Sequence, residues 1–294
     1  FTHFAYNNTK NMLYYIDWDV SEVIIPGTPL RWYSLMFLAG FSIGYFMMKR
    51  FFTNEKAPIE WLDSLLMYMV LGTILGARLG HCLFYDWDYF SQHPLEILLP
   101  VKFEPTFRFT GFQGLASHGG ALGIILSLWI WSRKISKRPL LWILDRMVVP
   151  TALTGAFIRF GNLMNSEIVG KETDAPWGFI FRRLNEDFPR HPVQLYESLS
   201  YLIIFVLLFF IYWKTDAKDK LGRIFGTFFV TVFGMRFFLE YFKRSQGGIE
   251  TFLGDSLSTG QWLSIPFVLI GLYFMVRPPV IFKPSTHKVK RKKT

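Results

Sequence analysis

The chain has 294 residues, of which 51% are hydrophobic, 19% aromatic and only 18% charged. Several apolar runs reach the roughly 20 residues that a helix needs to cross a hydrocarbon core about 30 Å thick. This composition argues against a soluble domain and predicts an all-α polytopic membrane protein. The formal charge of +10 lies in loops and in a basic tail, so we expect no nucleic-acid partner.

Cysteine and histidine usage limits the chemistry further. The single cysteine, Cys82, forms no intramolecular disulfide, and the six histidines show no zinc-ligand spacing, so we expect no metal site. Because Cys82 lies in an apolar run, we interpret it as a small buried hydrophobic residue. The first apolar run begins too far into the chain for a cleavable signal peptide, and none is expected.

Seven apolar runs predict about seven transmembrane helices. They cover approximately residues 30–52, 61–85, 114–132, 140–164, 194–213, 221–241 and 259–275. We expect residues 1–29 to form an extracytoplasmic segment, 30–276 the membrane domain and 277–294 a basic tail. In the second run, glycines recur every four residues at Gly72, Gly76 and Gly80, which is typical of closely packed membrane helices.

Basic residues indicate the orientation of these helices. The connections after the first, third and fifth runs share one side with the tail, and they hold Lys49, Arg50, Lys56, Arg133, Lys134, Lys137, Arg138, Lys214, Lys218, Lys220 and the run Lys288 to Lys293. The positive-inside rule makes this side cytoplasmic and places the N-terminus outside. The small outer region then consists of loops 86–113, 165–193 and 244–258. Short strands and an interfacial helix are both compatible with the first of these loops.

The fourth run carries polar residues at membrane depth. Arg159 and Asn162 are three positions apart, so a helix presents them on one face. Such groups usually face a cavity, a partner or a substrate rather than lipid. The structural alternative is a snorkelling arginine followed by an amide that bonds the helix end.

The second and third runs add further candidates. His118 precedes Gly119 and Gly120, which leave the backbone open to a head group or to another helix. With an ordinary pKa of about 6.5, a histidine there can exchange a proton at neutral pH, and a hydrogen-bonded structural role is the alternative. Arg78 is unusual at its depth, and its structural role would be to pair with an acid or with carbonyl groups.

The fifth and sixth runs each contribute a charged element. Arg236 and Glu240 are four positions apart and can pair, either for structure alone or as part of an anion-holding pocket with Arg159. The planar fork of arginine suits phosphate, so two arginines favour a phosphodiester. Residues 190–197, RHPVQLYE, open the fifth run as an N-terminal cap or as a functional element.

Taken in order, these elements resemble the bacterial prolipoprotein diacylglyceryl transferase family. The resemblance extends from about Leu30 to the seventh run, and its ordered motifs make it highly specific. The family signature G-R-x-G-N-F-x-N-x-E is matched from Arg159 to Glu167, and Gly170 and Pro176-Trp177-Gly178 follow it. The other matches are His118 to Gly120, Arg190 to Glu197, Arg236 with Glu240, and Trp32, Tyr33, Leu35 and Met36.

Three positions depart from the family pattern. Ile158 replaces the glycine before the signature arginine, and Ser166 stands where the family often has glycine. Val232 replaces a tyrosine four residues before the arginine of the sixth helix, which puts any role of that tyrosine in doubt for this chain.

The resemblance implies a reaction and a location. Such enzymes transfer the diacylglyceryl group of phosphatidylglycerol to the cysteine thiol of a lipobox in a preprolipoprotein, forming a thioether and releasing glycerol phosphate. No metal or cofactor is implied. The expected location is the bacterial cytoplasmic (inner) membrane. A lateral opening between helices is also expected, because both substrates arrive from the bilayer.

The resemblance also implies roles for individual residues. Arg159 and Arg236 are expected to bind the phosphodiester and Asn162 the glycerol head group, while Glu167 and Glu240 orient the arginines. His118 is the first candidate for proton handling, and Tyr33 is either the second candidate or a hydrogen-bonding partner of the head group. The remaining expected substrate-binding residues are Gly119, Gly120, Asn165, Arg78, His191 and Gln194. An anion transporter is the competing class, disfavoured because the chain shows no internal repeat, and an inert scaffold is a third.

Overall fold

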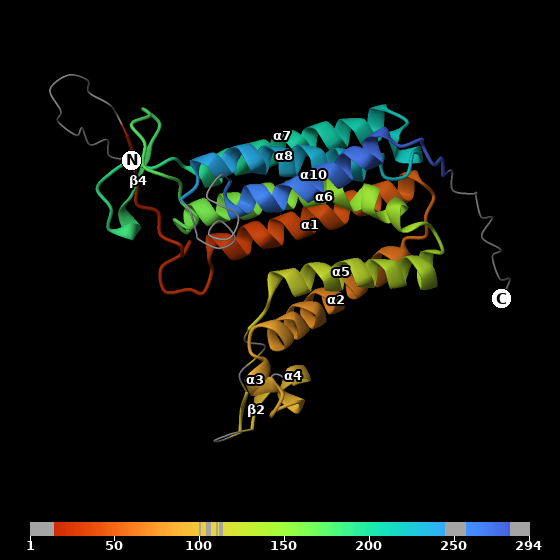
Figure 1. Ribbon diagram of the computed structural model, residues 1–294, viewed down its shortest axis with the longest axis horizontal. Helices are drawn as coiled ribbons and strands as arrows, with labels where there is room; N and C mark the ends of the chain where they lie inside the picture. Colours follow the sequence, from red (N-terminus) through yellow and green to blue (C-terminus); the bar gives the residue numbers. More distant parts are fainter. Residues whose placement is uncertain are drawn as a thin grey trace. The chain divides into compact units, whose positions relative to one another are not determined.

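The computed structural model describes residues 15–99, 101–103, 107–109, 111, 114–244 and 257–282, and these are mainly helical (Figure 1). The chain divides into two compact units, which we describe separately. The first unit comprises residues 1–48 and 144–285, and the second comprises 49–143 and 286–294. The predicted loop 244–258 and the tail from residue 283 lie almost entirely outside the described residues.

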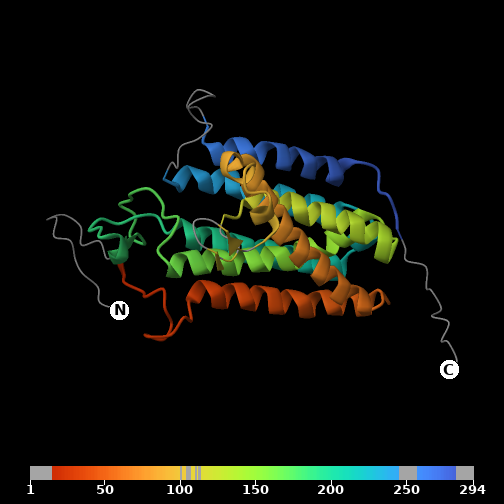
Figure 2. The ribbon, with the colours of Figure 1, turned by 90° about the horizontal axis from the view of Figure 1, so that it is seen from below.

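The first unit is a bundle of five long helices. These are α1 (Trp32–Asn54, up to residue 48), α6 (Leu140–Met164, from residue 144), α7 (Val193–Lys214), α8 (Arg223–Leu239) and α10 (Thr259–Val276). The axes of these helices are roughly aligned in both views (Figures 1 and 2). Glycines allow close helix contacts here, since a Cβ on Gly40 of α1 would lie 2.9 Å from Thr154 of α6.

A small extramembrane cap joins the start of the chain to the predicted outer loop 165–193. Strand β1 (Ile16–Trp18) pairs in parallel with β4 (Phe179–Phe181), and a 3₁₀ turn, Arg182–Leu184, follows β4. The Trp18 indole donates a hydrogen bond to the Leu163 carbonyl at the end of α6 (3.1 Å). The cap therefore contacts the C-terminal end of α6, the helix that carries Arg159 and Asn162.

The second unit is built on two crossing helices, α2 (Glu60–Phe84) and α5 (Ser117–Trp131). The connection between them contains the short helices α3 (Trp87–Phe90) and α4 (Leu95–Leu98), and an antiparallel pair of strands, β2 (Val101–Lys102) and β3 (Arg108–Phe109). Both alternatives that the sequence left open for this loop are therefore present.

The seven predicted spans all correspond to helices. Among the described residues, six helices are long and apolar enough to cross a membrane: α1, α2, α6, α7, α10, and α8 with the 3₁₀ turn that extends it to Phe242. The third predicted span is α5, which has only 15 residues and continues into a π-helical turn, Ser132–Ser136. It starts later than predicted because Gly114 has a φ of +77° and Ala116 is extended.

The predicted glycine face of α2 packs against α5. A Cβ on Gly76 would lie 2.4 Å from the carbonyl oxygen of Gly119 and 2.7 Å from the Cα of Gly123. A Cβ on Gly80 would lie 2.8 Å from the Cα of Gly119. Because these neighbours are backbone atoms, the helices must separate to admit even one methyl group.

We expect Gly76→Ala to destabilise the protein by about 2 kcal/mol, because overpacking forces the two backbones apart. The measurement is thermal unfolding of the full-length protein in detergent. Gly234→Ala on α8 is the matched control, since a Cβ there would meet no atom within 4 Å. Equal unfolding temperatures for the two variants would contradict the packing account.

Candidate functional site

The signature residues of α6 form a connected polar network. The Arg159 guanidinium donates to the Asn162 side-chain oxygen (3.3 Å), as their spacing on one helix face predicts. The amide nitrogen of Asn162 donates to Glu167 (3.0 Å), and Asn165 donates to the other oxygen of the same carboxylate (3.2 Å). Glu167 therefore orients Asn162 and Asn165, and acts on Arg159 only through Asn162.

The acidic partner of Arg159 is Glu197 on α7. The Arg159 Nε lies 2.9 Å from Glu197 Oε2, and the Lys243 ammonium lies 2.8 Å from Glu197 Oε1. The Glu197 side chain is only 1% exposed, whereas that of Arg159 is 18% exposed. Water screens the charge of a buried carboxylate only weakly. The Glu197 carboxylate therefore attracts both cations strongly and fixes the direction of the Arg159 guanidinium.

Glu240, which the sequence predicts as the partner of Arg236 on the sixth helix, pairs with Lys243. Glu240 lies 3.4 Å from Lys243, and none of the ion pairs among the described residues joins Glu240 to Arg236. Glu240 keeps helical backbone angles, and its backbone N–H still bonds to the Arg236 carbonyl, so the different pairing comes from its side chain turning toward Lys243. Arg236 is half-buried, and the Tyr201 hydroxyl lies within electrostatic range of both Arg236 and Arg159.

The start of α7 is hydrogen-bonded to the loop that follows α6, residues 165–193, which we call the signature loop. Gln194 is fully buried, and its amide donates to the Glu167 backbone carbonyl. His191 lies 3.2 Å from the Tyr196 hydroxyl, which accepts a hydrogen bond from the Trp177 indole (2.8 Å). The Tyr196 proton is thus available to Nδ1 of His191. Burial lowers the pKa of His191, which favours the neutral ring at pH 7.

Tyr33 lies against the signature helix. It is half-buried on α1, and a Cβ on Gly161 of α6 would come within 3.2 Å of its ring. Gly161 therefore lets the tyrosine approach the α6 backbone two residues from Arg159.

The other predicted site residues belong to the second unit. His118 is exposed at the start of α5, and Gly119 packs on Gly76 and Gly80, so the glycines serve the approach of another helix. Gly120 lies beside Ala77. Arg78 donates to the backbone carbonyls of the α3–β2 connection, which is the carbonyl partnership that the sequence offered as its structural role.

Comparison with known families now adds to this geometry. A family model described as prolipoprotein diacylglyceryl transferase matches residues 22–277. The chain belongs to this family. The prediction made from the ordered motifs is therefore confirmed.

Curated members of the transferase family align with nearly the whole chain. One from Tolumonas auensis is 45% identical over 261 residues, covering 88% of this chain and 96% of the relative. One from Bacteroides fragilis is 43% identical over 270 residues, covering 90% and 96%. One from Porphyromonas gingivalis is 42% identical over 289 residues, covering 94% and 98%. Each is named phosphatidylglycerol–prolipoprotein diacylglyceryl transferase.

The predicted site did not include two residues of this network, Glu197 and Lys243. Glu197 belongs to residues 190–197, which the sequence predicts as an N-terminal cap or a functional element, and the sequence predicts no role for Lys243. The signal for Glu197 was an acid inside an apolar helix, where an unpaired charge is costly. Lys243 follows a span, where basic residues are common, and so gave no signal of its own.

The network combines cations with carboxylates. Arg159, Arg236 and Lys243 supply three positive charges, and Glu197 and Glu240 hold two of them through ion pairs. The Arg159 side chain stays 18% exposed while its Nε and Nη1 contact Glu197 and Asn162. Among the described residues, no group of three or more histidine, cysteine, aspartate or glutamate side chains could hold a metal ion.

Proposed function

We propose that this chain transfers the diacylglyceryl group of phosphatidylglycerol to the lipobox cysteine of a preprolipoprotein. Membership of the family and the names of relatives that align over nearly their whole length support this reaction. The observation that carries it is the Arg159 fork, held by buried Glu197 and by Asn162 on one helix face.

The reaction requires a thiolate and a stabilised leaving group. The substrate sulfur attacks the glyceryl carbon bound to phosphate, the carbon–oxygen bond breaks, and glycerol phosphate leaves with the bonding electrons. Because an ordinary thiol has a pKa of about 8.5, a base must take its proton. The charge that develops on the phosphate must be met by cations.

The network supports a division of roles. Arg159 and Arg236 bind the phosphodiester, and Asn162 binds the glycerol head group. Glu197 positions Arg159, while Glu167 positions Asn162. His118 remains the first candidate for the proton, because a neutral imidazole can accept it, and Tyr33 is the second candidate or a hydrogen-bonding partner of the head group.

The supporting residues receive a more limited role. Asn165 and Gln194 hold Glu167 through its carboxylate and its carbonyl, and we assign them to positioning. His191 closes the same loop through Tyr196. Gly119 and Gly120 are assigned to helix packing around His118.

The proposed setting is the bacterial cytoplasmic membrane. The six helices of membrane-spanning length and the family support a membrane enzyme. The distribution of basic residues supports an external N-terminus and a cytoplasmic tail. Lateral entry follows from substrates that both reside in the bilayer.

The deciding experiment is a mass-shift assay with the purified protein, phosphatidylglycerol and a peptide that carries one lipobox cysteine. The expected product is a diacylglyceryl adduct on the thiol, with an equal amount of glycerol phosphate released. A peptide with serine in place of cysteine is the control. Folded protein that binds phosphatidylglycerol but forms no adduct would overturn the transfer reaction in favour of transport or binding.

A further inference from the structure

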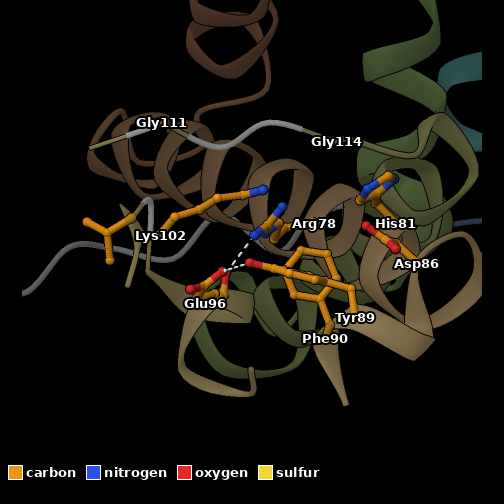
Figure 3. Close-up of a pocket in the computed structure, with 10 residues that line it drawn as sticks. Arg78, His81, Asp86, Tyr89, Phe90, Glu96, Lys102, Gly111 and Gly114 are labelled. Carbon is orange, nitrogen blue, oxygen red and sulfur yellow. Dashed lines mark hydrogen bonds between the residues drawn. The ribbon is translucent and has the colours of Figure 1, made fainter. Parts of the chain in front are cut away.

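The second unit contains a cavity of about 360 Å³ that the proposed reaction does not use. It is lined by residues from the end of α2, from α3 and α4, and from strand β2 (Figure 3). Charged side chains from three of these elements point into it. The folding of the second unit therefore brings charged side chains from several elements together around this cavity.

Two cations face each other across this cavity. Figure 3 shows the Lys102 ammonium pointing toward the Arg78 guanidinium. Arg78 is 6% exposed, and hydrogen bonds to the carbonyls of Ile97 (3.0 Å) and Glu96 (2.6 Å) fix its direction. Like charges that face each other repel, so an anion between them would stabilise both.

Glu96 carries a negative charge within electrostatic range of Lys102, but its carboxylate is hydrogen-bonded to other groups. Its carboxylate is 1% exposed and already accepts hydrogen bonds from the Tyr89 hydroxyl (2.6 Å) and from the Phe103 amide (2.8 Å). These bonds hold the pKa of Glu96 below its usual value, so it stays charged while pointing toward its donors. The other acid of the cavity, Asp86, lies at the opposite end beside His81 (Figure 3).

The surroundings indicate which kind of anion fits. Large apolar side chains are exposed on the helices that form the cavity, including Phe84 (82%), Leu95 (66%), Leu98 (61%) and Trp87 (51%). The cavity also lies at the end of α2, one of the helices of membrane-spanning length. Where a helix such as α2 spans a bilayer, the phosphate groups of the lipids lie near its ends. The acyl chains of those lipids would cover the exposed apolar side chains.

We propose that this cavity binds the phosphate group of a membrane phospholipid through Arg78 and Lys102. The apolar side chains around it contact the acyl chains. Arg78, which the family resemblance named among the substrate-binding residues, is assigned here to this separate site, and occupancy of the site does not require the reaction. It serves to hold a lipid against the second unit.

The first test follows Lys102 in the unmodified full-length protein. Acylation of lysines by an amine-reactive reagent is measured by peptide mass spectrometry in detergent, with and without phosphatidylglycerol. We expect phosphatidylglycerol to slow acylation of Lys102 about tenfold, as for a charge-assisted contact, and to leave the exposed Lys134 unchanged. Diacylglycerol, which lacks the phosphate, should give no protection.

Two outcomes would overturn the proposal. Equal acylation of Lys102 with phosphatidylglycerol and with diacylglycerol would exclude a phosphate contact. Equal protection by inorganic phosphate at the same concentration would show that the cavity takes free phosphate and not a lipid.

A second test uses a matched pair of variants. Native mass spectrometry counts the phosphatidylglycerol molecules bound to the parent, Lys102→Gln and Lys134→Gln proteins. We expect Lys102→Gln to lose one bound lipid, Lys134→Gln to lose none, and Lys102→Arg to retain it. Unchanged lipid counts in Lys102→Gln would refute the site. Because binding is measured without the peptide substrate, this result is independent of the transfer assay.

Discussion

Arg159→Lys is expected to lower the rate of diacylglyceryl transfer by about 100-fold or more. Lysine keeps the positive charge but loses the fork, which uses Nε for Glu197 and Nη1 for Asn162. A single ammonium does not hold both partners and a phosphate in one geometry. The rate of adduct formation at saturating phosphatidylglycerol measures the effect, and thermal unfolding verifies the fold.

Arg183→Lys is the matched control for this prediction. Arg183 makes the same type of ion pair in the extramembrane cap, at 3.5 Å from Glu22. We expect its transfer rate to stay within about twofold of the parent, as is usual for exposed ion pairs. A parent-like rate in Arg159→Lys would contradict the assignment of the phosphodiester to this arginine.

Glu197→Gln is expected to lower both stability and activity. The change leaves the cations of Arg159 and Lys243 close together without their shared carboxylate. Removing one member of a buried ion pair costs about 3 kcal/mol, and Arg159 loses the partner that orients it. Thermal unfolding in detergent and the mass-shift assay measure the two effects.

Further variants separate positioning from stability. Glu197→Asp keeps the charge but shortens the reach, so we expect most of the stability to return while transfer stays slow. Adding Lys243→Met to Glu197→Gln removes the second cation, and the double-mutant cycle should show a favourable interaction between these positions. Glu22→Gln in the extramembrane cap is the control. Full activity in Glu197→Gln would refute the positioning role.

Much of the fold could be predicted because the signal is local. Apolar length predicted the helices, and the four-residue glycine spacing predicted close packing of α2 against another helix, which the structure shows to be α5. The bond between Arg159 and Asn162 likewise follows from their positions on one helix. Periodicity did not indicate the late start of α5, because it depends on the backbone angles at Gly114 and Ala116.

The wider network could not be predicted because its partners are distant in the chain. Glu197 meets Arg159 and Lys243 only when α6, α7 and the end of α8 are packed together. Helix spacing predicted Arg236 as the partner of Glu240, but spacing gives only which residues can meet, and Glu240 pairs with Lys243 beyond the end of α8. Pairing across helices requires the three-dimensional structure.

The hydrogen bond from Trp18 to the Leu163 carbonyl has a consequence for biosynthesis. It supplies a donor to a carbonyl at the end of α6 from a residue 145 positions earlier in the chain. The first strand must therefore wait, already outside the ribosome, until four predicted spans have been made. Lys243 emerges later still, so the signature loop reaches its final arrangement only near the end of synthesis.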